Sequence, residues 1–108
     1  MGYVLGIDLG TTWTAAAVSR NGRVDIVGLG NRHAVVPSVV YLRDDEEVLI
    51  GEAAQRRSTT DPDRVAREFK RRIGDPTPIL VGTTPYSAEA LSAKVLRWVV
   101  DRVAEREG

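Results

Sequence analysis

Short apolar runs separated by polar turns fill the first third of the chain and predict three strands. The strands are expected over residues 4–9, 14–19 and 23–29, with polar turns at residues 10–13 and 20–22 between them. The Asn-Gly pair in the second turn is typical of a tight hairpin. Because consecutive strands joined by short turns usually pair with each other, the pattern predicts an antiparallel meander.

The pattern in the middle of the chain predicts two strands and a short helix. Apolar runs favour strands over residues 35–42 and 48–50, with a turn at residues 44–46 between them. Pro37 lies inside the first run and indicates an edge strand or an irregular strand start, since proline cannot donate a ladder hydrogen bond. A short helix is expected over residues 52–57.

A second helix is predicted from Asp61, as N-cap, to the residue before Gly74, with Pro62 at the first helical position. At about 100° per residue, one side of this helix would be apolar. That side carries Val65, Ala66, Phe69 and Ile73. Lys70 borders this stripe. Its ammonium could reach toward a cleft, or its stem could simply lie along the surface with the charge in water.

The last third predicts a strand over residues 79–81, a turn over residues 82–85, and a long helix from the N-cap Ser87 to about residue 107. The apolar arc of this helix is wider than burial on one side requires. It contains Leu91, Val95, Leu96, Trp98, Val99, Val100 and Val103. The excess predicts contact with structure outside this chain or with another copy of it.

Composition narrows the class of protein. The chain has 108 residues, 43% of them hydrophobic, which suits one packed domain. Its 15 basic and 15 acidic residues cancel, so no overall field favours nucleic acid or an anionic membrane. The absence of cysteine excludes disulfides and thiolate chemistry and fits a reducing cytoplasm. No signal peptide or membrane-spanning run is expected, and His33 is interpreted as a solvated loop residue.

The first turn carries the candidate chemistry. Asp8 interrupts an apolar strand, and a carboxylate there needs either solvent or a cation such as a divalent metal. Gly10 permits a tight bend, after which the N–H groups of Gly10, Thr11, Thr12 and Trp13 could surround phosphate oxygens. The threonine hydroxyls would add donors. The alternative is a hairpin in which these residues only satisfy turn and strand preferences.

Four segments, in order, give the chain a resemblance to the N-terminal end of the ATPase domain of the seventy-kilodalton heat-shock chaperone family. They are residues 6–12, residues 30–32 with 37–40, residues 51–54 with 70–74, and residues 87–96. The first segment is shared with sugar kinases and other relatives of actin. The lysine segment and Pro37-Ser38-Val39-Val40 narrow the resemblance to the chaperones.

The resemblance implies an α/β fold of the ribonuclease H-like, actin-like ATPase class. The chain would form part of the first lobe: a phosphate-loop meander over residues 1–34, a small α+β outer subdomain over residues 35–86 and the long helix over residues 87–108. ATP or ADP with magnesium would be the cofactors. A cytoplasmic location, and unfolded client peptides and co-chaperones as partners of the whole protein, are further expectations.

Roles are implied residue by residue. Asp8 would help to hold magnesium, largely through water, and Gly10, Thr11, Thr12 and Trp13 would contact phosphates. Lys70 would reach the γ-phosphate and the attacking water, placing positive charge where negative charge develops. The remaining walls of the site lie elsewhere in such proteins, so this chain alone is expected to have little or no ATPase activity.

The chain departs from the family pattern at three places, and two alternative functions are also open. Trp13 replaces the usual asparagine or tyrosine, the link between Asn31 and Ser38 is longer than usual, and the segment between Gly74 and Ser87 is much shorter. One alternative is a small-molecule kinase of the same superfamily. The other is a non-catalytic interaction module that self-associates through its last helix.

Overall fold

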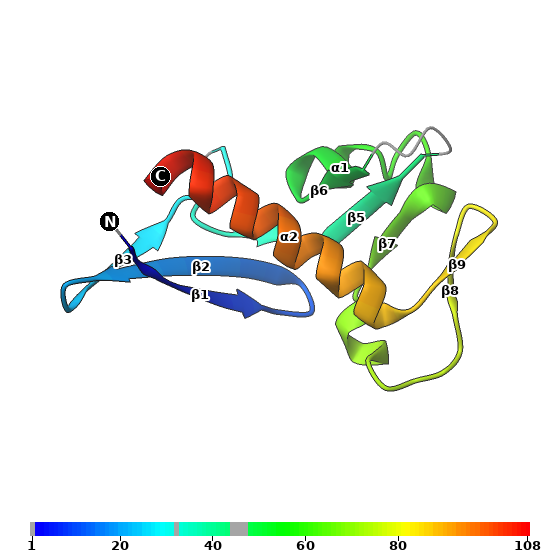
Figure 1. Cartoon of the computed structure of the whole chain (residues 1–108). Coiled ribbons are helices and arrows are strands. Elements are labelled where there is room, and N and C mark those ends of the chain that lie inside the picture. The colour runs from blue at the N-terminus through cyan, green and yellow to red at the C-terminus, as the bar shows by residue number, and fades with distance from the viewer. Residues whose placement is uncertain (1, 32, 44–47) are drawn as a thin grey trace.

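The computed structural model describes residues 2–31, 33–43 and 48–108, which form a four-stranded sheet, a three-stranded sheet, a two-stranded hairpin and one long helix (Figure 1). The first sheet contains β1 (Val4–Leu9), β2 (Trp13–Arg20), β3 (Arg23–Val27) and β4 (Val36–Pro37). β1 pairs antiparallel with one edge of β2, and β3 and β4 pair with the other edge. The predicted meander is confirmed, although its third strand ends at Val27 instead of residue 29.

The two faces of the first sheet differ, because successive side chains on a strand point to opposite faces. One face lies against the long helix and buries apolar side chains of β1, β2 and β3. They are Leu5, Ile7, Leu9, Ala16, Val18 and Val27. The opposite face exposes Val4, Val24 and Ile26, with 71%, 66% and 69% of their surface accessible. No described element covers that second face.

A second sheet is built around β5 (Val39–Leu42), which pairs antiparallel with β6 (Val48–Ile50) on one side and β7 (Val65–Arg67) on the other. The short helix α1 (Glu52–Arg56), expected from the sequence, packs Ala54 against Val39 and Tyr41. The Tyr41 hydroxyl donates to Asp61 Oδ2 at 2.9 Å. The turn predicted at residues 44–46 lies outside the described residues.

The helix predicted over residues 61–73 does not exist. That segment forms the short 3-10 turn η1 (Pro62–Arg64), strand β7 and a second 3-10 turn, η2 (Phe69–Arg72). Asp61 does not cap a helix with its side chain, since it accepts from Tyr41 instead.

Two physical reasons explain this error. β7 satisfies its backbone groups by pairing with β5, where Ala66 lies opposite Val40. A helix would also have placed Arg64, Arg67 and Arg71 at successive spacings of three and four residues, where like charges repel. Tertiary pairing therefore overrides a favourable capping pattern.

The remaining hairpin contains β8 (Ile79–Val81) and β9 (Thr84–Tyr86). β8 was predicted. Thr84 and Pro85 were assigned to a turn, but they pair with Val81 and Leu80, so the turn itself is confined to Gly82 and Thr83.

The long helix α2 (Ala88–Glu107) supplies much of the core. Ser87 caps it as predicted, with its hydroxyl accepting from the Ala90 N–H at 3.0 Å. One stripe of the helix is completely buried: Leu91, Val95, Val99 and Val103. Leu96 and Val100 remain 37% and 42% exposed, so the described residues do not cover the whole apolar arc.

One ion pair joins the distant ends of the chain. Arg20, at the end of β2, places Nη1 2.7 Å from Glu107 Oε1 and donates from Nη2 to the Glu107 carbonyl at 2.9 Å. Figure 1 shows the start of β1 and the last turn of α2 at the same end of the molecule. No helix in the described part of the chain is long and apolar enough to cross a membrane.

Candidate functional site

The turn between β1 and β2 is closed by its own backbone. Gly10 donates from its N–H to the Trp13 carbonyl at 3.0 Å. A Cβ atom on Gly10 would lie 2.5 Å from that same carbonyl oxygen, which is closer than any side chain tolerates. Glycine is therefore required at this position by the close approach of two backbone segments.

Ser38 holds the same turn from outside. Its hydroxyl donates to the Gly10 carbonyl at 2.8 Å, and its N–H donates to the Thr12 carbonyl at 2.9 Å. Its oxygen also lies 2.7 Å from the buried Thr14 hydroxyl. A serine hydroxyl has one hydrogen, so Thr14 must be the donor in that last bond. Ser38 thereby fixes both sides of the turn.

Two hydroxyl groups of the turn do not take part in these bonds. In the described part of the chain, the hydroxyls of Thr11 and Thr12 have no hydrogen-bond partner. Asp8 is exposed on the open face of the first sheet, where it lies opposite Ala15. Trp13 is 54% exposed. The Gly10 N–H, in contrast, is already occupied by Trp13 and is not available to a phosphate, which corrects one part of the predicted set of donors.

A pocket of about 350 Å³ opens beside the turn. Its walls come from the turn, from the segment that contains Ser38, from α1 and from the end of β7. The lining residues are Thr11, Thr12, Trp13, Pro37, Ser38, Val39, Gln55, Arg67 and Glu68. The pocket therefore joins the first sheet to the chain segment that leads into Lys70.

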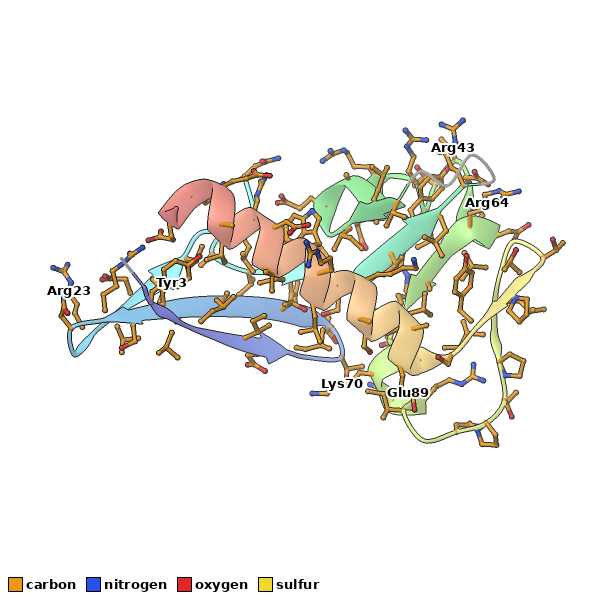
Figure 2. The ribbon with its side chains drawn as sticks, in the orientation of Figure 1. Tyr3, Arg23, Arg43, Arg64, Lys70 and Glu89 are labelled. Atoms are coloured by element: carbon orange, nitrogen blue, oxygen red, sulfur yellow. The ribbon has the colours of Figure 1, made fainter. Side chains whose placement is uncertain are left out.

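Lys70 is positioned by an unusual backbone at Glu68. Glu68 has φ 55°, in the left-handed region that non-glycine residues rarely adopt. This conformation ends β7 and starts η2, so that Phe69 enters the core with 2% of its surface exposed while Lys70 stays in solvent. In the view of Figure 2, both Lys70 and the β1–β2 turn lie in the lower middle of the molecule.

The lining of the pocket combines three hydroxyl side chains, Thr11, Thr12 and Ser38, with one cation, Arg67, and one carboxylate, Glu68. Asp8 and Glu68 are its nearby carboxylates, and the described residues contain no cluster of three or more side chains suited to hold a metal. Magnesium would have to rely on phosphate oxygens and water together with Asp8. His33, as expected, is an exposed loop residue.

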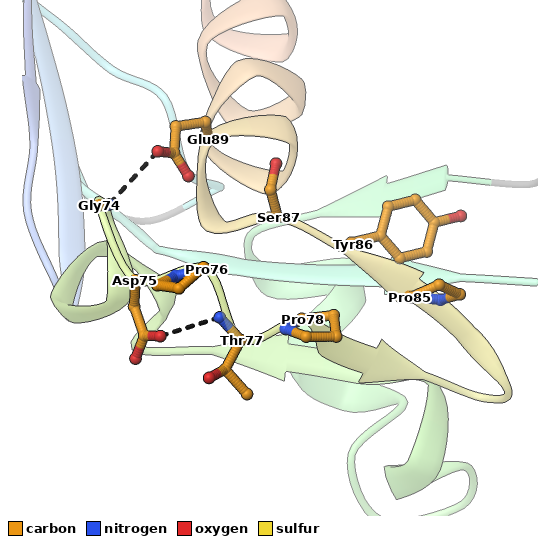
Figure 3. A pocket seen from close by; sticks show the side chains of 9 residues that line it. All are labelled: Gly74, Asp75, Pro76, Thr77, Pro78, Pro85, Tyr86, Ser87 and Glu89. Carbon is orange, nitrogen blue, oxygen red and sulfur yellow. Dashed lines mark hydrogen bonds between the residues drawn. The ribbon is translucent and has the colours of Figure 1, made fainter.

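A second pocket, of about 520 Å³, lies between the connector after η2 and the start of α2 (Figure 3). It contains no residue of the β1–β2 turn. Glu89 accepts from the Gly74 N–H at 3.3 Å, and Asp75 accepts from the Thr77 N–H at 2.9 Å. The hydrogen bonds from Thr77 hold the pKa of Asp75 below its usual value. These bonds order the connector between η2 and β8.

The sequence did not predict the positioning roles of two residues, Ser38 and Glu68. Ser38 was noticed only as part of a motif, yet a polar residue between Pro37 and a run of apolar residues is a signal of a buried hydrogen bond. Glu68 gave no signal, because a left-handed backbone is expected at glycine or asparagine and not at glutamate.

Comparison with known proteins identifies the family of this chain. A sequence model of the family described as "Hsp70 protein" matches residues 4–104. The "Chaperone protein DnaK" of Ureaplasma urealyticum serovar 10 is 36% identical over 105 residues, which cover 97% of this chain. The chain spans only 17% of the length of that relative. The match over nearly the whole chain shows that this protein belongs to the Hsp70 family.

Proposed function

We propose that this chain forms one wall of an ATP site, with the β1–β2 turn as the first phosphate loop. The observation that carries the proposal is the outward presentation of two unpartnered hydroxyls, on Thr11 and Thr12, by a turn that Gly10 and Ser38 hold rigid. Donors fixed in advance bind an anion without the cost of ordering them. A hairpin needing only turn chemistry would not require a second segment to brace it.

Lys70 is proposed to meet the γ-phosphate from the other side of the same pocket. It follows Arg67 and Glu68, which line the pocket, and its ammonium is exposed. A fixed positive charge near the transferred phosphoryl group lowers the barrier by stabilising the charge that develops there. Asp8 would orient magnesium-bound water, and Trp13 would form part of the cleft wall. Bound Mg-ATP would supply the phosphoryl group and the metal's charge.

The proposal also concerns the fold class of the chain and its division into segments. The meander of residues 1–34, the outer subdomain of residues 35–86 and the helix of residues 87–108 are proposed to be pieces of a ribonuclease H-like lobe. Membership in the Hsp70 family supports this over a sugar-type kinase. Hydrolysis, client peptides, co-chaperones and a cytoplasmic location are proposed for a protein that contains the whole domain, because this chain corresponds to 17% of its relative.

Two measurements test the proposal. Calorimetric titration of this chain with Mg-ATP should give weak or undetectable heat, because only one wall is present. A longer protein that carries the complete domain should hydrolyse ATP, and Lys70→Ala should abolish turnover. Arg71→Ala, which removes a neighbouring exposed cation, is the matched control. Unchanged turnover in the Lys70 variant would remove the role assigned to Lys70.

A second function is favoured by a separate observation. Leu96 and Val100 on α2, and Val4, Val24 and Ile26 on the open sheet face, are exposed apolar residues. Surfaces of this kind commonly mark protein interactions. We therefore also propose that the isolated chain associates with other copies, and this property does not depend on nucleotide binding.

A further inference from the structure

Among the described residues, Arg67 is the arginine of segment 61–75 that has no carboxylate partner. The other arginines of that segment each place a guanidinium nitrogen 3.9 Å from a carboxylate oxygen: Arg64 with Asp61, Arg71 with Glu68 and Arg72 with Asp75. In the part of the chain that the structure describes, the Arg67 guanidinium makes no hydrogen bond, ion pair or ring contact. Its charge is therefore available to a ligand.

The pairing of β7 with β5 brings Arg67 beside the phosphate-loop turn. Arg67 ends β7, and its Cα partner on β5 is Val39, the residue directly after the Ser38 that holds the turn. The preceding residue of β7 is buried whereas Arg67 is exposed, because successive side chains of a strand point to opposite faces. Arg67 lines the pocket of about 350 Å³ together with Thr11 and Thr12.

The carboxylate of the same pocket has a cation of its own. Glu68 also lines the pocket, so the charges of the lining residues sum to zero. However, Glu68 Oε2 lies 3.9 Å from Nη2 of Arg71, which is not a lining residue. The relevant feature is therefore this pairing and not a net positive charge: Glu68 is matched by Arg71, and Arg67 is left opposite hydroxyl groups.

We propose that Arg67 binds a phosphate group of the nucleotide together with Thr11 and Thr12, an inference that rests on the proposed ATP site. A guanidinium presents a planar fork of N–H donors that matches two oxygens of one phosphate. The two threonine hydroxyls are without partners among the described residues and supply further donors in the same pocket. Lys70 would add a point charge, whereas Arg67 would fix the orientation of the phosphate through two parallel hydrogen bonds.

The test is a titration of this chain with inorganic pyrophosphate, followed by ¹H–¹⁵N correlation spectra, with sodium chloride at equal ionic strength as the reference. The amides of Thr11 and Thr12 and the side-chain Nε–H of Arg67 should shift together in a saturable manner. Arg67→Gln should weaken the affinity about tenfold, the loss expected for one charge-assisted hydrogen bond. Arg67→Lys keeps the charge without the fork, so it should retain only part of the affinity, and it provides a second variant should the first disturb the fold.

Arg97→Gln is the matched control, because it removes one positive charge at a side chain that is 77% exposed and does not line the pocket. It should leave the affinity unchanged. Equal losses in the Arg67 and Arg97 variants would indicate a general effect of charge and overturn the inference.

The remaining outcomes distinguish the role of Arg67 from the proposed ATP site. Saturable shifts of Thr11 and Thr12, with unchanged affinity in Arg67→Gln, would overturn the role of Arg67 and leave the phosphate loop standing. Shifts of Arg67 without those of Thr11 and Thr12 would place the anion outside the loop and count against both. The absence of any saturable shift would overturn the inference, whereas the ATP site keeps its separate test in the turnover of Lys70→Ala in the longer protein.

Discussion

The Ser38 hydroxyl donates to the Gly10 carbonyl at 2.8 Å, across 28 positions of sequence. This bond joins the first turn of the chain to the segment that opens the outer sheet. Because Thr14 donates in turn to Ser38, the three residues form a chain of hydrogen bonds with Ser38 at its centre. The shape of the proposed phosphate loop therefore depends on a residue that belongs to another strand segment.

Replacing Ser38 with alanine should lower the free energy of unfolding by about 1–3 kcal/mol, because Thr14 would keep a buried hydroxyl with no acceptor. Urea denaturation followed by circular dichroism measures this. Ser58→Ala serves as control, since that hydroxyl only bonds the Gln55 carbonyl at an exposed site, and its loss should be much smaller. Equal effects of the two substitutions would contradict the central role of Ser38.

Gly10→Ala should open the turn. The added methyl carbon would lie 2.5 Å from the Trp13 carbonyl oxygen, so the backbone must move and the Gly10–Trp13 hydrogen bond must lengthen. We expect a loss of stability of roughly 1–3 kcal/mol, as for other strained backbone sites. Gly6→Ala in the same hairpin is the control, because its added Cβ would meet only the Ala17 carbonyl, at 3.9 Å. A Gly10 variant as stable as the Gly6 variant would refute the packing argument.

The stability of the chain should fall in acid partly through Asp75. Hydrogen bonds from Thr77 depress the pKa of Asp75 in the folded state, so its contribution is present above the unfolded pKa of about 3.9 and is lost as the pH falls through the lower folded value. Urea midpoints measured from pH 2 to pH 6 should therefore decline less steeply in Asp75→Asn. Asp63→Asn, at another exposed carboxylate, is the comparison. Identical slopes for wild type and Asp75→Asn would exclude this contribution.

Self-association should depend on the exposed side of α2. Replacing Leu96 and Val100 with glutamate places two charges on that surface, and the average mass measured by light scattering should fall toward that of the monomer at high concentration. Arg97→Glu changes the charge of the same helix without altering its apolar surface, so it should leave association intact. A wild-type chain that is monomeric at every concentration would reject the prediction.

Local patterns in the sequence predicted the meander, the short helix α1 and the capped helix α2, because each depends on contacts between near neighbours. Ser87, for example, finds its partner three residues away at Ala90. Segment 61–73 could not be predicted in this way. Its structure is decided by the pairing of Ala66 with Val40, a contact between distant parts of the chain.

In the candidate site too, features set by near neighbours were predictable and features set by distant contacts were not. Gly10, Thr11 and Thr12 were identifiable because a glycine and two hydroxyls follow a strand directly. The brace supplied by Ser38 and the backbone conformation of Glu68 depend on how the two sheets meet. The sequence therefore pointed to the residues of the proposed phosphate loop and did not reveal the residues that position them.

The ion pair between Arg20 and Glu107 has a mechanical consequence. Val4, at the start of β1, lies opposite Ser19, so the first strand begins beside the point where the last helix is tied down. A force that separates the two ends of the chain would load this pair first and then peel β1 away from β2 one backbone hydrogen bond at a time. The last rung to open would be Leu9 with Thr14, next to the turn. Under tension, the proposed phosphate loop should therefore outlast the rest of its own hairpin.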